Sequence, residues 1–485
     1  MIRSALGLEL RTLVRSPLRA FVLVLILATG ALVLMQGERD VERWRGAVEN
    51  ARMEQDESLE EVRAFFSAGQ LGPEDRPWVD LSQARWQDWY AASRLVREPA
   101  PLAGIAFASP EAGAVAVRIN RFANPLVAQG SRIENPELAA VGGLDLATVL
   151  ALLLPLVILA MGVEIGGQER ASGLLSLVRV QSGRDQSWLV ARCLAVGIIG
   201  ATVGLLLAAM ASVVGGASLE TSLTLSVLVL VYVAFWTALL VAVACVSRHP
   251  SQGAVALGGL WIVFCVLIPA VGVERSAALA AGDYGLDLTV EARDAGAAFA
   301  ELEEEALFRR LLERFPNLED RVPEDRASAV SLARDGLRTI ALEERVAQRE
   351  LMGAEQAKLV QLMSTLSPVV AFTRALEGLA GRDPEAAREY QRAVVAAVAA
   401  RTERYIESSW ISDPLDAEDF EELHALAAGA IESRADLQTG VWAILIGWTI
   451  LLVLVARCLG KRSSADGRFG WAPLLAGSDF ESRPA

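Results

Sequence analysis

The stretch QERASGLLSLVRVQSGRD, residues 168–185, is the part of this chain whose residue types and spacing point most clearly to chemistry. It opens with the ion-pair formers Glu169 and Arg170, and Gly173 then allows the backbone to turn closely. Apolar residues follow at helical spacing, namely Leu174, Leu175 and Val178. A short helix with exposed leucines between charged residues is suited to insertion into a groove on a partner protein. The alternative is a helix that rests on lipid headgroups, and the residues alone leave these two interpretations nearly even.

Motifs for nucleotide, proton and metal chemistry are missing from the sequence. It contains no G-x-x-x-x-G-K-[ST] phosphate loop, and its two lysines, Lys358 and Lys461, do not fit that pattern. No histidine or carboxylate lies in the middle of an apolar stretch, where a proton relay would need one. The two histidines and four cysteines lack metal-ligand spacing. We therefore expect that this chain is not an enzyme and that it binds no cofactor itself. If the protein moves a substrate, we expect ATP and magnesium to be bound by a partner subunit.

Three further residues lie at positions where a transport protein could use them. Asp145 stands at the mouth of an apolar stretch, where it could meet a polar substrate or cap the start of a helix, and capping is the more common role. Pro155 and Pro269 lie within apolar stretches, where a proline acts as a hinge or as a simple kink.

Apolar and charged residues are segregated along the sequence. The 485 residues are 53% hydrophobic and 21% charged, with a mean hydropathy of +0.37. A bilayer core about 30 Å thick needs roughly 20 apolar helical residues to cross it, and six stretches meet this requirement. They are residues 20–36, 144–164, 190–214, 221–246, 253–273 and 439–459. The predicted fold class is a mainly α polytopic membrane protein with six transmembrane helices.

The charges outside these stretches predict the orientation in the membrane. Residues 1–19, the turn 247–252 and the tail 460–485 are basic, and all three fall on one side if there are six spans. The long segments 37–143 and 274–438 are acidic and fall on the other side. We therefore expect both termini in the cytoplasm, a bacterial cytoplasmic (inner) membrane, and two extracytoplasmic domains. The acidic segments argue against a nucleic-acid partner.

The segments outside the spans differ in predicted structure. Leucines on one stripe of residues 1–19, with arginines off it, predict an amphipathic helix in contact with membrane lipid. Segment 37–143 begins helical and then becomes loop-rich, which predicts a mixed domain. Segment 274–438 is almost all helix in pattern. Within it, Asp383 is suited to cap a helix that starts at Pro384.

The chain resembles the membrane subunit of an ABC-2-type transporter. In that family the loop between the second and third spans carries an ER-x-x-G-x-L-x-x-L element, the coupling helix that docks on the ATP-binding subunit. The positions of this chain that match the element or continue it, all in the loop 165–189, are Glu169, Arg170, Gly173, Leu174, Leu175, Leu177 and Val178. Ser182 and Arg184 match the turn that follows, although Gln181 replaces its proline. Arg192 keeps the charge of a lysine found before the third span.

Two more resemblances concern other parts of the chain. Residues Leu8 to Pro17 are similar to the elbow helix of the same family. Glu134 to Ala160 and Leu366 to Asp383 are similar to permeases often labelled multicopper-enzyme-maturation permease-like, which carry an uncharacterised outward insert. The outward segments lack the cysteine, methionine and histidine clusters that soft metals prefer, so we expect no metal site.

Three functional hypotheses follow from these observations. The first, which the resemblance implies, is the permease subunit of an ATP-driven ABC transporter, an exporter, with two ATPase copies and a second permease copy or paralogue. The second is a membrane-anchored periplasmic binding or assembly scaffold without transport, although a single anchor would suffice for that role. The third is an intramembrane enzyme, which the isolated serines and threonines of the spans disfavour because they suit helix packing.

Overall fold

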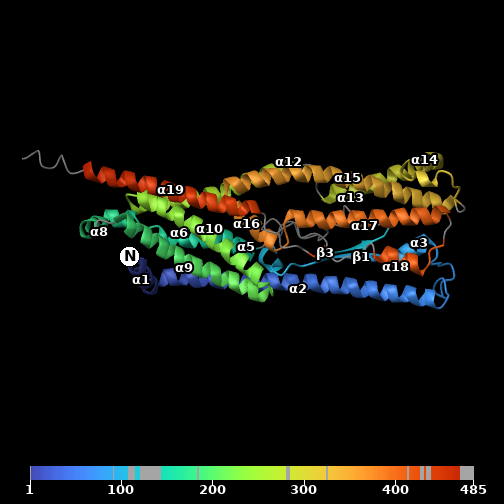
Figure 1. Ribbon diagram of the computed structural model, residues 1–485, viewed down its shortest axis with the longest axis horizontal. Helices are drawn as coiled ribbons and strands as arrows, with labels where there is room; N and C mark the ends of the chain where they lie inside the picture. Colours follow the sequence, from blue (N-terminus) through green and yellow to red (C-terminus); the bar gives the residue numbers. More distant parts are fainter. Residues whose placement is uncertain are drawn as a thin grey trace, which may run out of the picture.

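The computed structural model of the chain is a long bundle made mainly of helices (Figure 1). It describes residues 2–90, 92–107, 115–120, 144–182, 185–279, 285–323, 326–411, 414–425, 431–432 and 439–469. Segment 121–143, Arg184 and the end of the tail, 470–485, lie outside these residues. Six helical segments are long and apolar enough to cross a membrane, as the sequence predicts, so the chain is a multi-pass membrane protein.

The apolar parts of the six candidate spans form one half of the molecule, which we call the apolar bundle. The spans are Pro17–Ser67, Leu146–Ala171, Asp185–Val214, Leu219–Val246, Pro250–Ser276 and Gly440–Leu459. The helices that build them are α2 (Pro17–Ser67), α5 (Leu146–Thr148), the π-helix η4 (Val149–Leu153), α6 (Leu154–Gly162), α7 (Gly167–Ala171), α9 (Asp185–Val214), α10 (Leu219–Val246), α11 (Pro250–Ile262), the π-helix η5 (Val263–Leu267), α12 (Ile268–Leu279) and α19 (Thr439–Phe469). The second, third and fourth spans are more than half buried and make the centre of the bundle, while the other three lie around it.

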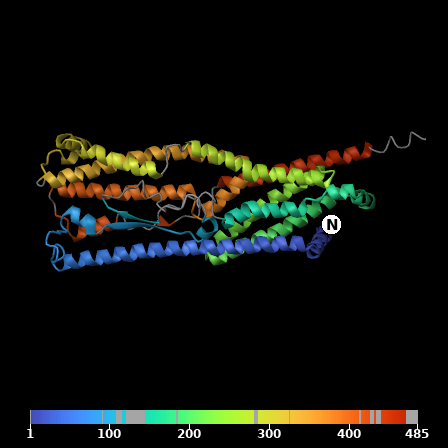
Figure 2. The same cartoon turned by 180° about the vertical axis from the view of Figure 1, so that it is seen from behind.

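The first span does not end where its hydrophobic residues end. We expected it over 20–36, but α2 is one continuous helix of 51 residues. Beyond Gly37 its sequence is charged and contains one glycine, Gly46, and no proline, so nothing in it interrupts the backbone hydrogen bonds. At 1.5 Å per residue the helix is about 75 Å long. It therefore joins the apolar bundle to the other half of the molecule without a hinge (Figure 2).

The other half, which we call the distal half, combines both long segments between spans. Its sheet has the order β2 (Ala116–Ile119), β1 (Ser93–Glu98) and β3 (Ile431–Glu432), with β1 antiparallel to β2 and parallel to β3. Its other elements are α3 (Ala84–Tyr90), α13 (Gly285–Ala300), α14 (Glu304–Arg314), the 3-10 helix η6 (Pro316–Leu318), α15 (Arg326–Leu366), α17 (Pro384–Ile411) and α18 (Ala417–Ala425). The 3-10 helix η1 (Ala103–Ala106) lies between the two halves, since Ile105 packs in the core of the spans and Ala103 packs with Val96 of β1. The two segments share hydrophobic cores, since Ala84 packs in one cluster with Leu307 and Tyr405. The predicted helix start at Pro384 is confirmed, and Asp383 accepts a bond from the N–H of Ala386 (3.4 Å).

One helix of segment 274–438 does not lie in the distal half. Helix α16 (Pro368–Leu379) packs in the same hydrophobic core as the spans. Its cap, Ser367, donates from Oγ to the carbonyl of Phe264 (3.0 Å), and the ring of Phe372 stacks on Tyr232 with centroids 3.8 Å apart. The chain therefore re-enters the apolar bundle between α15 and α17. The expectation that all of 274–438 lies outside the spans overlooked this helix, whose apolar residues need burial.

Four parts of the chain lie at one end of the bundle, which we call the α8 end after the short helix α8 (Leu174–Ser182). They are α1 (Ile2–Arg15), the pair α7 and α8, the turn between α10 and α11, and the C-terminal end of α19 (Figures 1 and 2). The predicted amphipathic helix is α1, which ends before Ser16 because this residue caps α2. Its Ala5 and Glu9 are buried, whereas Leu10 and Val14 face outward, as in a helix that lies along a membrane surface.

Candidate partner-docking site

The loop between the second and third spans is folded into two short helices, α7 and α8. Two glycines with positive φ, Gly166 (+88°) and Gly173 (+76°), set their directions. A Cβ on Gly166 would lie 2.2 Å from the carbonyl oxygen of Ala244, so only glycine allows α7 to approach the end of α10 this closely. The turn that the sequence predicts at Gly173 is present, and the predicted short helix follows it directly.

Helix α8 presents a row of apolar residues to solvent at the α8 end. Leu174, Leu177 and Val180 are 40%, 52% and 86% exposed and lie three residues apart, so they share one face. Leu175 is only 6% exposed and packs in the core of the spans, and Val178 is half-buried. We call Leu174, Leu177 and Val180 the α8 ridge. The sequence places all these residues on one helix. The structure shows that the α8 ridge is exposed, whereas Leu175 fixes the helix to the core of the spans.

Glu169, which lies in α7, belongs to a buried ion cluster. Its carboxylate accepts from the N–H of Gly166 (2.7 Å) and from Nη1 of Arg192 (2.5 Å). Arg192 also donates from Nε to Glu9 (2.7 Å), and both carboxylates are almost fully buried. The cluster joins α7, α9 and α1. The sequence does not predict this pairing, although it contains an arginine near the end of an apolar span and a single acid in the amphipathic helix.

Arg170 binds the end of a different span. Its guanidinium donates to the carbonyl oxygens of Ala244 (2.8 Å), Cys245 (2.8 Å) and Ser247 (2.5 Å). The last carbonyls of a helix have no partner within the helix, and a cation there is favourable. Arg170 therefore caps α10 and fastens α7 to it. The charged groups of Glu169 and Arg170 are thus engaged within the chain, and the α8 ridge is the exposed apolar part of the site. Arg184 lies outside the described residues.

Asp145 caps a helix, which is the more common of the two roles predicted for it. Its Oδ1 accepts from the backbone N–H of Thr148 (2.8 Å) and from the hydroxyl of the same residue (2.7 Å). It is buried at the end of the second span, away from the α8 end.

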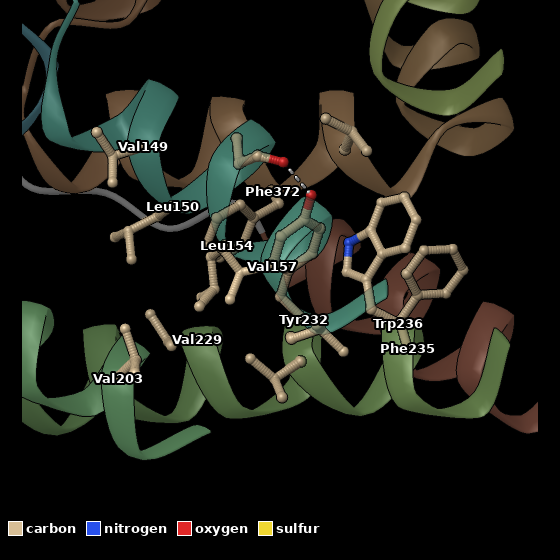
Figure 3. Packing of buried hydrophobic residues seen from close by; sticks show 14 of the residues in the cluster. Val149, Leu150, Leu154, Val157, Val203, Val229, Tyr232, Phe235, Trp236 and Phe372 are labelled. Carbon is tan, nitrogen blue, oxygen red and sulfur yellow. Dashed lines mark hydrogen bonds between the residues drawn. The ribbon is translucent and has the colours of Figure 1, made fainter. Parts of the chain in front are cut away.

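Pro155 and Pro269 each follow a π-helical segment. In η4 the N–H of Leu154 donates to Val149 five residues back, and in η5 the N–H of Ile268 donates to Val263 in the same way. A proline has no N–H, so carbonyls in the preceding turn lose their helical donor. Neighbouring helices replace it. Tyr232 Oη donates to the carbonyl of Ala151, four residues before Pro155 (2.6 Å; Figure 3), and Ser367 donates to Phe264, five residues before Pro269.

Replacing Tyr232 with phenylalanine should therefore destabilise the apolar bundle. The change keeps the stacked ring but leaves the Ala151 carbonyl without its donor in a dry core, which costs about 1–3 kcal/mol. We expect a lower melting temperature in detergent, measured by intrinsic fluorescence. Tyr90, whose hydroxyl accepts from Arg76 in an exposed pair (2.8 Å), provides the matched control. A Tyr232→Phe protein that melts like Tyr90→Phe would show that the carbonyl does not need the bond.

Comparison with known proteins identifies one region. A family described as a domain of unknown function, DUF3526, matches residues 287–427. This region runs from α13 to the end of α18 and includes the re-entering helix α16. No curated protein matches the chain.

Proposed function

We propose that this chain is the permease subunit of an ATP-driven ABC-2-type exporter, and that the α8 ridge docks on its ATPase. The observation that carries the proposal is the construction of the α8 end. An apolar ridge of three residues is exposed on the short helix α8, whose Leu175 packs in the core of the spans. The preceding helix α7 is fixed by the ion cluster with α1 and α9 and by Arg170 on α10. Exposed apolar side chains on a rigid support are what a helix-in-groove contact requires.

The chain itself has no phosphate loop, so ATP and magnesium would be bound by two copies of a separate ATPase. A second permease copy or paralogue would complete the assembly. The α8 end would face the cytoplasm of a bacterial inner membrane, and the distal half would face outward. When the ATPases close on ATP, they would press on α8. Its movement would pass through Glu169 and Arg192 to α1 and α9, and through Arg170 to α10.

The first experiment is affinity purification of the tagged chain from native membranes in mild detergent. Co-purified proteins are identified by mass spectrometry, and ATP hydrolysis is assayed. We expect a P-loop ATPase in near-stoichiometric amount with the wild-type chain. The double change Leu174→Asp and Leu177→Asp should abolish its recovery, because it places two charges in the apolar contact. Membrane insertion should be unchanged, because both side chains are exposed.

The matched control is Val322→Asp, which changes an apolar residue of the distal half that is 86% exposed. It should leave the ATPase bound. Leu175→Asp does not serve this purpose, because Leu175 is buried and a charge there would disrupt the fold. Retention of the ATPase by the α8 double variant would refute the docking role of the ridge, and a wild-type chain without any ATPase would refute the transporter assignment.

The size of the distal half favours a second candidate, an assembly scaffold without transport. In that case the distal half would bind an envelope protein and the α8 ridge would rest on lipid. Recovery of a stoichiometric envelope protein without ATP hydrolysis, unaffected by the α8 double variant, would support the scaffold over the permease.

A further inference from the structure

A chain of buried polar groups crosses the distal half and connects four of its elements. Arg401 of α17 binds Asp88 of α3 (Nε to Oδ1, 3.1 Å) and donates from Nη1 to Oγ of Ser93 in β1 (2.7 Å). The same Oγ lies 3.2 Å from Nδ1 of His424 in α18. All four side chains are at least 95% buried. His424 is one of only two histidines in the protein.

The contacts of Ser93 define how His424 can bond to it. Arg401 is always a donor, so it occupies an acceptor site on Ser93 Oγ. The serine oxygen keeps a second acceptor site and its one hydrogen, so Ser93 either donates to Nδ1 of a ring protonated on Nε2 or accepts from a protonated Nδ1. The charges around the ring, rather than this bond, decide how many protons it carries. Among the described residues Nε2 has no hydrogen-bond partner.

The charges around His424 do not favour a second proton. The Arg401 guanidinium is close by, and Asp88, which could offset a new positive charge, already binds Arg401. On α18 itself, Glu421 is held by Arg63 of α2 in a two-bond pair (2.5 and 2.8 Å), and Asp56 of α2 is a more distant acid. Burial, and then Arg401, lower the pKa of His424 to about 4.

We propose that the Ser93–His424 contact is a proton-sensitive latch that holds α18 on β1. A second proton on the ring places a positive charge in a buried site beside the Arg401 guanidinium, so the protonated ring leaves this site. Release of His424 loosens α18 from β1. The strand β3, which follows α18 in the chain, pairs with β1, and the next element is α19, which contains the last span. An acidic compartment around the distal half would thereby act on the last span. This inference does not depend on the proposed transport function.

The direction of the pH effect follows from the linkage of protonation to opening. The pKa of His424 is lower in the closed state than its ordinary value of about 6.5 in an open one. Between these two values the open state binds one more proton than the closed state. Closure is therefore complete near neutral pH and weakens as the pH falls, and the opening constant rises by up to about tenfold for each pH unit. Below about pH 4 the slope should end.

Hydrogen exchange of the full chain in lipid nanodiscs tests the latch. Exchange is measured by mass spectrometry from pH 7.5 to 4.5 and corrected for the intrinsic chemical rate at each pH. We expect the opening constants of peptides from α18 and β1 to rise with a slope near one proton per molecule below about pH 6.5. Glu421 does not interfere, because Arg63 holds the pKa of its carboxyl below the ordinary value.

The two histidines give a matched pair of variants. His249 is exposed at the start of α11, so His249→Gln should keep the slope, whereas His424→Gln should abolish it. Ser93→Ala removes the bond to the ring in the closed state and should raise the opening constant of α18 without moving the pH at which the slope begins. The wild-type, His249→Gln and Ser93→Ala results decide the question even if His424→Gln does not fold. Flat exchange of α18 in the wild type, or the same slope in a folded His424→Gln protein, would overturn the latch.

Discussion

Replacing Arg192 with methionine should lower the free energy of unfolding by about 3–5 kcal/mol, because it removes one partner from a buried ion cluster. Glu9 and Glu169 are almost fully buried, and each makes an ion pair with Arg192 at 2.5 Å. Without the guanidinium the buried carboxylate of Glu169 loses its ion-pair partner, and Glu9 keeps a longer contact with Arg19 (3.8 Å). The structure can relieve the unpaired charge by taking up a proton or by separating α7 from α9.

The melting temperature of the purified protein in detergent measures this effect, and Arg179→Met provides the control at the same end of the bundle. Arg179 pairs with Asp185 at 2.6 Å, but its side chain is 46% exposed. Exposed pairs contribute about 0–1 kcal/mol, so this variant should melt close to the wild type. Adding Glu9→Gln and Glu169→Gln to Arg192→Met should recover part of the loss. Equal melting temperatures for the Arg192 and Arg179 variants would contradict the role of the cluster.

Gly37→Ala should be the most damaging of the small substitutions in α2. An added Cβ would lie 2.0 Å from the carbonyl oxygen of Gly104 and 2.8 Å from its carbon. Both atoms are backbone, so no side-chain rotation can relieve the clash. Leu102 and Ile105, on either side, are buried in the core of the spans and prevent η1 from moving away. We expect a loss of about 3 kcal/mol in the free energy of unfolding, measured as a lower melting temperature.

Gly46 in the same helix is the natural control for this prediction. A Cβ on Gly46 would meet no atom within 4 Å, so alanine adds only its better helix propensity. Gly46→Ala should therefore stabilise α2 by up to about 1 kcal/mol. Each variant adds one methyl group to the same helix, so they differ only in the surroundings of that group. If both raised or both lowered the melting temperature, the close approach of α2 to η1 would not be the cause.

The sequence by itself determined the features of this protein that depend on local pattern. Six apolar stretches predict six spans, because a backbone inside a membrane must satisfy its own hydrogen bonds and needs a fixed length to cross. Asp383 before Pro384 predicts a helix start, and Asp145 predicts a cap, because capping involves residues only three positions apart. The short helix after Gly173 is predicted for the same reason. The described residues contain six helical segments long and apolar enough to span a membrane, and the helix start, the cap and the short helix are present.

Only the tertiary structure decided which of these residues are free and which are held. Leu174 and Leu175 are adjacent leucines in sequence, yet one is exposed and the other is anchored in the core, because helical neighbours point 100° apart and α8 has a single supporting face. Glu169 finds Arg192 on another helix, and His424 finds Ser93 more than 300 positions away. The insertion of α16 among the spans likewise depends on helices distant in the sequence. No local pattern contains these contacts, since they exist only when separate elements pack together.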